Sequence, residues 1–366
     1  MSQVGQNGTF DVESELGVSQ IGTMKRVLVV GLTLLTSAVT ALCAEEVKAE
    51  TVLERIKGME EALGFMESKL ARGLNDLMWW QRLQDVARID KVRFTGPPNR
   101  STNQPGGTNE VIVAAYTFLP RKPARKMPLI VFAHGEIHGN VTSDEEAEIV
   151  RELIEQGYAV IAPDYRGSSG YGGDFWRQID YGGLEVEDVF AARNWMIENE
   201  GRVDRQRVGI IGWSHGGLIA LLNACAHPEA YQAVYAGVPV TDLITRIKYR
   251  EAGYEGLFSA PFHINKKVAE APEEYRRRSP ITHVDKLRAP LLIHGNTSDE
   301  DVRVIEIEKM IEALRAAGKN FEHKIYTNAP GGHHFNRLDT KLARESRAEI
   351  YRFLARHLRP PRQAYR

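Results

Sequence analysis

The sequence predicts an α/β fold whose sheet is mostly parallel and carries helices on both faces. Short apolar runs alternate along the chain with longer segments of helical periodicity, and such alternation is typical of parallel sheets. One of these runs, residues 208–211, leads into a serine between glycines, Ser214, and the apolar segment 218–226 follows it. A strand, a tight turn and a helix are therefore expected in that order.

The turn itself, Gly212-Trp213-Ser214-His215-Gly216, has the form of a nucleophile elbow. In such an elbow, a sharp bend between strand and helix lifts the serine hydroxyl to where a base and a substrate carbonyl can reach it. The five-residue pattern by itself also occurs in ordinary glycine-rich turns. The strand before it and the helix after it favour the α/β-hydrolase fold, with Ser214 as the catalytic nucleophile.

The acid and the histidine that such a serine requires follow in the order used by this fold. The apolar run 289–295 ends in an acidic loop, residues 299–301, and the alternating run 321–326 leads into His333 and His334. Both loops follow the C-terminal ends of predicted strands, the edge at which parallel sheets bind ligands. A histidine at this edge would take the proton of the serine, and an acid would hold its ring and stabilise the imidazolium.

The negative oxygen that forms during acyl transfer needs two backbone N–H donors. In this fold His215, directly after the nucleophile, supplies one donor, and the turn after the strand at 129–133 supplies the other. That turn contains Gly135 and Glu136. A carboxylate beside a developing negative charge opposes catalysis, so we interpret Glu136 as a solvated loop residue. The alternative is that Glu136 receives an amino group of the substrate.

Several segments resemble the catalytic domain of the prolyl oligopeptidase family of serine peptidases, from about Val111 to the C-terminus. Residues 158–172 are similar to the signature of the family's second strand, residues 212–217 to its nucleophile block, and residues 279–295 to the approach to its acid loop. The resemblance implies a serine-type peptidase that cleaves short peptides through an acyl-enzyme intermediate.

The resemblance also selects among the candidate acids and bases. The family's acid stands three residues before a valine, which indicates Asp299 ahead of Val302. Its histidine follows a glycine and precedes an x-Phe pair, which indicates His333. Asp301 would then face solvent or cap the following helix. Because the acid loop is one residue longer here than is usual in the family, Asp301 stays a substitute for Asp299.

Two further departures from the family bear on the substrate. The oxyanion turn reads His134-Gly135-Glu136-Ile137 where the family usually has His-Gly-Gly-Pro. The residues ahead of the hydrolase show no repeat of ~40 residues, so no β-propeller is expected to restrict entry. The same triad also serves esterases, and a small acetyl or aryl ester is therefore the alternative substrate. A catalytically dead binding module is disfavoured because all three triad members are present.

The composition suits a soluble globular enzyme, with 43% hydrophobic and 26% charged residues and a formal net charge of −1. There is no basic excess to suggest a nucleic-acid partner. Histidines cluster at His134 and His138 and at His333 and His334, but without the spacing of additional Cys or acidic ligands that a metal site requires. We therefore expect neither a metal nor a cofactor.

The N-terminal residues have the pattern of a secretory signal peptide. A charged start at Met24 precedes the apolar run 27–42 and a small-residue exit at residues 43–44. We expect residues 1–23 to be a start-site extension and residues 24–44 to be the signal peptide of a protein exported to the periplasm or the extracellular space. The apolar run is shorter than the ~20 residues that span a bilayer, so no stable membrane span is expected.

Residues 45–90 are expected to form a helical arm ahead of the hydrolase domain, residues 91–366. Apolar residues recur in the arm every three or four positions, which is typical of an amphipathic helix. This apolar stripe consists of Leu53, Ile56, Met59, Leu63, Met66, Leu70, Leu74 and Leu77. The stripe either packs on the hydrolase or contacts a second copy of the chain, so a homodimer through the arm is one of two alternatives.

A long aromatic segment, residues 241–279, lies between two predicted strands and forms a cap near the active-site edge. Its aromatic residues are Tyr249, Tyr254, Phe258, Phe262 and Tyr275. These rings either line the pocket for the acyl group or pack in a small core of the cap itself. The second use is the commoner one for aromatic residues in such a segment.

Overall fold

The computed structural model describes residues 15–98, 110–259 and 263–362. The chain divides into two compact units, Met1–Gly64 and Phe65–Arg366. The first unit contains most of helix α1 (Glu15–Leu83), and the second unit contains the last part of that helix and the whole sheet. Across the described ranges, no helix combines the length and the apolar character needed to cross a membrane.

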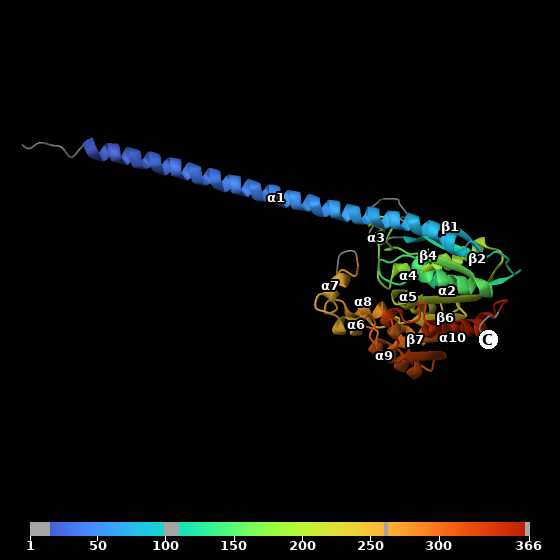
Figure 1. Ribbon diagram of the computed structural model, residues 1–366. Coiled ribbons are helices and arrows are strands. Elements are labelled where there is room, and N and C mark those ends of the chain that lie inside the picture. Colours follow the sequence, from blue (N-terminus) through green and yellow to red (C-terminus); the bar gives the residue numbers. More distant parts are fainter. Residues whose placement is uncertain (1–14, 99–109, 260–262, 363–366) are drawn as a thin grey trace, which may run out of the picture. The chain divides into compact units, whose positions relative to one another are not determined.

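The second unit is built on one eight-stranded sheet with the order β1-β2-β4-β3-β5-β6-β7-β8 (Figure 1). Strands β1 and β2 are antiparallel to their neighbours, and the pairs from β4 to β8 are all parallel. The expected mostly parallel sheet is therefore confirmed. The strands are β1 (Ala87–Pro98), β2 (Glu110–Pro120), β3 (Met127–Ala133), β4 (Ala159–Asp164), β5 (Val203–Trp213), β6 (Ala233–Gly237), β7 (Leu291–Asn296) and β8 (Phe321–Tyr326).

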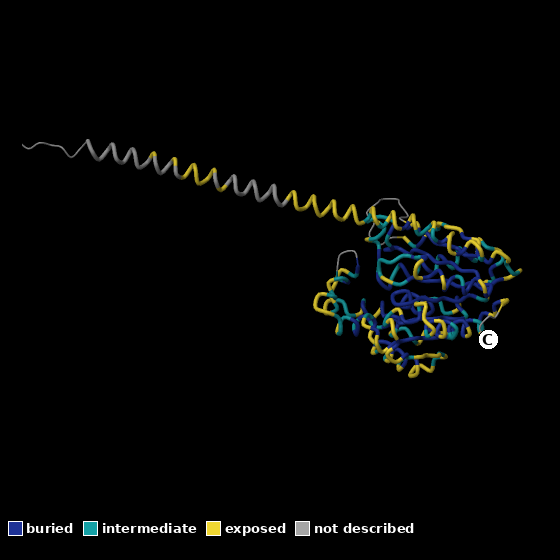
Figure 2. The backbone as a smooth tube through the Cα atoms, viewed as in Figure 1, coloured by how far each residue is buried: buried dark blue, intermediate teal, exposed yellow. Residues whose placement is uncertain are grey.

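Helices cover both faces of this sheet because successive residues of each strand point to opposite sides. In β5, Ile210 belongs to a core that includes α4, α5 and α9, whereas Ile211 belongs to a second core with α2 and α10. Both cores are dark blue in Figure 2, and the buried strands β3, β4 and β6 between them are almost continuously apolar. The long helices are α2 (Ser143–Gln156), α4 (Leu184–Asn199), α5 (His215–Ala226), α9 (Val304–Ala316) and α10 (Lys341–Leu358).

The cap between β6 and β7 consists of short helices. These are α6 (Leu243–Tyr249), α7 (Tyr254–Ser259), α8 (Pro272–Arg277) and the 3₁₀ helix η1 (Pro280–Lys286). Two other short elements lie near the same edge of the sheet, α3 (Gly173–Trp176) and the 3₁₀ helix η2 (Gly332–His334). The cap and η2 both follow the C-terminal ends of strands, where the sequence places the candidate site.

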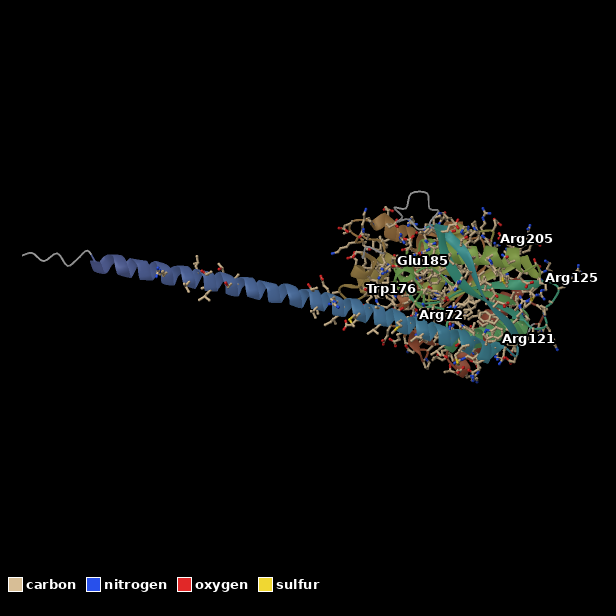
Figure 3. The ribbon with its side chains drawn as sticks, turned by 90° about the horizontal axis from the view of Figure 1, so that it is seen from above. Arg72, Arg121, Arg125, Trp176, Glu185 and Arg205 are labelled. Atoms are coloured by element: carbon tan, nitrogen blue, oxygen red, sulfur yellow. The ribbon has the colours of Figure 1, made fainter. Side chains whose placement is uncertain are left out.

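The last part of α1, from Phe65 onward, packs against the sheet through residues that are not in the apolar stripe. Trp79 and Leu83 are fully buried in the core of the second unit. Arg72 (Figure 3) forms an ion pair with the buried Asp164 at the end of β4. The sequence had placed the start of the hydrolase at residue 91, but these contacts make the end of the arm part of the same compact unit.

The apolar stripe itself stays in solvent within the second unit. Leu74 and Leu77 are 64% and 68% exposed, and Met66 and Leu70 are exposed to a similar degree. These four members of the stripe therefore do not supply the contact between the end of α1 and the sheet within this unit.

Candidate active site

Ser214 occupies a strained turn between β5 and α5. Its backbone has φ 57° and ψ −121°, a conformation that a non-glycine residue adopts only when its surroundings force it. Glycines on either side make the turn possible. A Cβ at Gly212 would lie 2.2 Å from the carbonyl oxygen of Gly216, and a Cβ at Gly216 would lie 2.2 Å from that of Ala133. Any side chain at either position would push the strand and the helix apart.

The register of the sheet explains why the predicted loops meet. Ala133 at the end of β3 pairs with Gly212 near the end of β5, so the oxyanion turn and the elbow leave the sheet together. Asn296 at the end of β7 likewise pairs with Tyr326 at the end of β8. The acid loop and the histidine loop therefore begin at one level on the same edge.

His333 and Asp299 are joined by a hydrogen bond. Nδ1 of His333 lies 2.7 Å from Oδ2 of Asp299, whose side chain is buried. The other carboxylate oxygen, Oδ1, accepts hydrogen bonds from the backbone N–H groups of Asp301 and Val302, both at 2.9 Å. The two backbone hydrogen bonds fix the carboxylate of Asp299, and the carboxylate in turn orients the ring of His333 through Nδ1. Nε2 is the ring nitrogen that Asp299 does not contact.

Asp301 approaches the same histidine from the opposite side. Its Oδ2 lies 3.6 Å from Nε2 of His333, while its Oδ1 accepts hydrogen bonds from Arg246 at 3.0 Å and Arg250 at 3.1 Å. Burial opposes ionisation of Asp301, but Arg246, His333 and Arg250 outweigh it and lower its pKa. Asp301 does not cap the next helix, α9, which has Arg303 as its N-cap. Its side chain is partly exposed, as expected, but two arginines of the cap hold it at the site.

The oxyanion turn is fixed by a buried tyrosine that sequence analysis did not single out. The hydroxyl of Tyr165 lies within hydrogen-bonding distance of the carbonyl oxygens of His134, at 3.1 Å, and Glu136, at 3.0 Å. A Cβ at Gly135 would lie 3.8 Å from the Cβ of Ser214, so the turn borders the candidate nucleophile. Glu136 is exposed and has φ 60°. Only contacts far apart in sequence identify the role of Tyr165.

The ring of His134 is structural. It is buried, it stacks on Tyr165, and its Nε2 lies 2.9 Å from the Ser168 hydroxyl. Burial lowers the pKa of His134 to about 4, which keeps the imidazole neutral near pH 7. Within the described part of the chain, no group of three or more His, Cys, Asp or Glu side chains is arranged to hold a metal ion.

Asn296 is a second residue that sequence analysis missed. It is buried, and its amide nitrogen donates to the carbonyl oxygens of Ala329 at 3.0 Å and Gly332 at 2.9 Å. Its Oδ1 accepts a hydrogen bond from the Ala329 N–H at 3.0 Å. Asn296 therefore ties the histidine loop to the end of β7, directly before the acid loop.

A cavity of about 520 Å³ opens above these residues. Ser214, His333, Gly135 and Glu136 lie in its wall together with Asp301. Among the described cap residues, Arg246, Arg250, Tyr254 and Leu257 complete one side. The volume falls within the range of ~300–1,000 Å³ that is usual for small-ligand sites.

Some aromatic residues of the cap line the cavity and others are buried in the core, so both predicted roles occur. Tyr254 lines the cavity, whereas Phe258 and Tyr275 are fully buried in the core. The Tyr249 hydroxyl forms a hydrogen bond with Glu306 instead. Phe262 lies outside the described residues. Two of the four described rings thus pack in the core, and one lines the pocket.

Comparison with known proteins relates this chain to one family of peptidases. A model of the prolyl oligopeptidase family matches residues 145–360, more than half of the chain. The chain is 28% identical to the uncharacterized peptidase YuxL of Bacillus subtilis, over 55% of this chain and 30% of the relative. It is 26% identical to dipeptidyl aminopeptidase BIII of Pseudoxanthomonas mexicana, over 64% of this chain and 35% of the relative. The chain thus spans about a third of the length of these two relatives.

Solved structures share the fold. An acylaminoacyl peptidase in complex with a chloromethyl ketone has a TM-score of 0.61 at 21% identity, over 74% of this chain and 42% of that one. A puromycin-hydrolyzing peptidase of Mycobacterium tuberculosis has a TM-score of 0.62 at 23% identity, over 74% of this chain and 39% of that one. The family match confirms the resemblance seen in the sequence, and the shared fold agrees with it: the chain belongs to the prolyl oligopeptidase family of serine peptidases.

Proposed function

We propose that this protein cleaves short peptides through an acyl-enzyme intermediate, with Ser214 as nucleophile, His333 as general base and Asp299 as the acid. The observation that carries the proposal is the 2.7 Å hydrogen bond between His333 Nδ1 and Asp299 Oδ2, in a cavity whose wall also contains Ser214. With Nδ1–H directed to Asp299, Nε2 is free to accept the serine proton.

In this mechanism Ser214 Oγ attacks the scissile carbonyl as its proton passes to Nε2 of His333. Asp299 stabilises the resulting imidazolium, which then protonates the leaving amine. The oxyanion receives hydrogen bonds from the backbone N–H of His215 and from the turn at Gly135 and Glu136. Water then attacks the acyl-enzyme with the same histidine as base, and Ser214 is regenerated.

A small carboxylic ester is the alternative substrate, because the same residues would hydrolyse it. We expect purified protein to cleave members of a panel of short peptides, including proline-containing ones, as followed by mass spectrometry. An aryl acetate serves as the ester comparison. Hydrolysis confined to the ester would exclude the peptidase proposal and leave the esterase.

We further propose that the protein is exported, on the strength of the charged start at Met24, the apolar run 27–42 and the small residues after it. N-terminal sequencing of the protein from its native cells is expected to give a start near residue 45. An intact N-terminus in the cytoplasmic fraction would contradict export.

We also propose that the apolar stripe of α1 pairs with a second copy of the chain. In the second unit its members are exposed, while Trp79 on the opposite face is buried against the sheet. In the sequence Ile56, Leu63, Leu70 and Leu77 recur every seven residues, the repeat of a coiled coil. One pair of flanking charges is complementary as well. In a parallel pair the g position of one helix faces the e position of the other, which brings Arg55 opposite Glu60 of the second copy.

Light scattering is expected to give the mass of a dimer for the wild-type protein. Replacing both Leu70 and Leu77 with Glu should give a folded monomer, because neither side chain contributes to the hydrolase core. Glu61→Gln, an exposed change at the outward f position of the same repeat, is the matched control and should stay dimeric. A monomeric wild-type protein would refute this contact.

A further inference from the structure

The arginines in the described wall of the catalytic cavity are already paired with acids. Arg246 contacts Asp301 at 3.0 Å and Glu306 at 3.4 Å. Arg250 contacts Asp301 at 3.1 Å, and Arg337 contacts Glu145 at 3.2 Å. Their positive charge is thus largely neutralised before a substrate enters. The cavity is therefore poorly suited to a substrate carboxylate.

Asp301 presents a carboxylate oxygen to the reaction centre. Its Oδ1 is used by the two arginines of the cap, whereas its Oδ2 lies 3.6 Å from Nε2 of His333, beyond the length of a hydrogen bond. The side chain is 37% exposed, so a bound substrate can reach it. Since its pKa is lowered, Asp301 is ionised at neutral pH. Oδ2 is therefore an anionic acceptor beside the nitrogen that exchanges protons with Ser214.

Glu136 adds a second carboxylate to the wall of the same cavity. It is exposed in the oxyanion turn, adjacent to Gly135, and it lines the same cavity. Negative charge at this place disfavours the oxyanion unless a cation compensates it. Because the arginines are held by other acids, a positively charged group of the substrate is the natural source of that compensation.

We propose that the cavity selects substrates with a protonated α-amine on the residue whose carbonyl Ser214 attacks, and that Asp301 Oδ2 accepts a hydrogen bond from this ammonium group. The inference rests on the proposed function and names its substrate class. The amine nitrogen is two bonds of about 1.5 Å from the carbonyl carbon. That carbon must lie next to Ser214 and His333, so the ammonium group falls within reach of an oxygen 3.6 Å from Nε2. Acylation of the amine removes the charge and two of its donors.

The test compares two substrates that differ only at the amine, alanine 4-nitroanilide and N-acetylalanine 4-nitroanilide. The wild-type protein is expected to prefer the free amine in kcat/KM. Asp301→Asn, which keeps the shape but removes the charge, should reduce this preference about tenfold, as expected for a charged hydrogen bond. Glu300→Gln removes the same charge from the neighbouring exposed residue outside this cavity and is the matched control, with the preference retained.

A second measurement does not depend on the folding of a variant. If charge carries the selection, raising the ionic strength from ~0.01 M to ~1 M should lower the wild-type preference, since screening weakens partly exposed charge pairs. Equal kcat/KM for the two anilides, preference for the acetylated one, or an unchanged preference in folded Asp301→Asn would overturn the inference.

Hydrolysis of 4-nitrophenyl acetate separates this inference from the proposed function. This ester has no amine, so its turnover reports on Ser214 and His333 alone. If the ester reacts while the two anilides are cleaved equally, the amine subsite is wrong and the hydrolase mechanism stands. If neither the ester nor any peptide reacts, the proposed function itself fails and takes the subsite with it.

Discussion

Asp299→Asn is expected to lower turnover by about 10⁴, the loss seen when the acid of a serine hydrolase triad becomes an amide. The structure supplies the reason. The Asn Oδ1 would keep the two backbone hydrogen bonds from residues 301 and 302, so the Nδ2 amide would be directed at Nδ1 of His333. An amide donor there favours the tautomer with hydrogen on Nε2, which cannot accept the serine proton. Steady-state hydrolysis of an aryl acetate measures the loss.

Asp301→Asn is the matched control for this prediction, because it makes the same chemical change two residues away. Its cost on the neutral ester should be much smaller, since Asp301 lies on the Nε2 side of the ring. Circular dichroism of both variants verifies that they are folded. An inactive Asp301→Asn beside an active Asp299→Asn would reverse the assignment of the acid, although the serine hydrolase mechanism would survive.

Ser214→Ala is expected to reduce turnover by about 10⁶, as loss of the nucleophile does in serine hydrolases. It should also abolish covalent labelling by a fluorophosphonate probe. The variant should fold, because the backbone N–H of residue 214 donates to the Gly237 carbonyl oxygen at 2.9 Å and this bond does not involve the hydroxyl.

Ser169→Ala tests whether any serine of the cavity could react with the probe. Ser169 also lies in the cavity wall, but its hydroxyl accepts a hydrogen bond from Asn140 at 2.7 Å. This variant should label like the wild type. Labelling that persists in Ser214→Ala would show that Ser214 is not the nucleophile.

Much of the candidate site follows from local sequence signals. The elbow is predictable because Gly212 and Gly216 occupy places where a Cβ would meet backbone atoms at 2.2 Å. Loops that follow parallel strands gather at one edge, so a serine, an acidic loop and a histidine in the right order already predict a common site. Strand β5 and helix α5 are both longer than the apolar runs 208–211 and 218–226 from which they were predicted. Such differences are usual at the ends of elements.

Local sequence signals do not decide whether Asp299 or Asp301 is the acid that contacts His333. Both are within a few residues of the expected position, and either could reach a histidine. The structure separates them because Asp299 turns back to accept the N–H groups of Asp301 and Val302, whereas Asp301 turns outward to Arg246 and Arg250. Helix α9 begins at Val304, and the loop before it supplies the backbone N–H groups for these bonds.

The apolar stripe of α1 predicts a helix but not the face by which that helix packs on the hydrolase. Its periodicity predicts a helix with one apolar face, and α1 is helical over the whole stripe. Periodicity cannot say which face meets the hydrolase. The contact is made by Trp79 and by the ion pair of Arg72 with Asp164. Asp164 is buried at the end of β4, and a buried carboxylate without a cation is strongly destabilising, so the face of α1 that carries Arg72 meets the sheet.

The sequence by itself determined the family, the mostly parallel sheet, and the three loops from which the candidate triad comes. These depend on signals within a few residues of each other: strand and helix periods, glycines in a tight turn, and chain order. Only the tertiary structure decided which carboxylate contacts Nδ1 of His333, that Tyr165 and Asn296 hold the loops, and that two arginines of the cap stand beside Asp301. Those pairings join residues tens of positions apart, and their geometry arises only when the sheet and the cap are packed together.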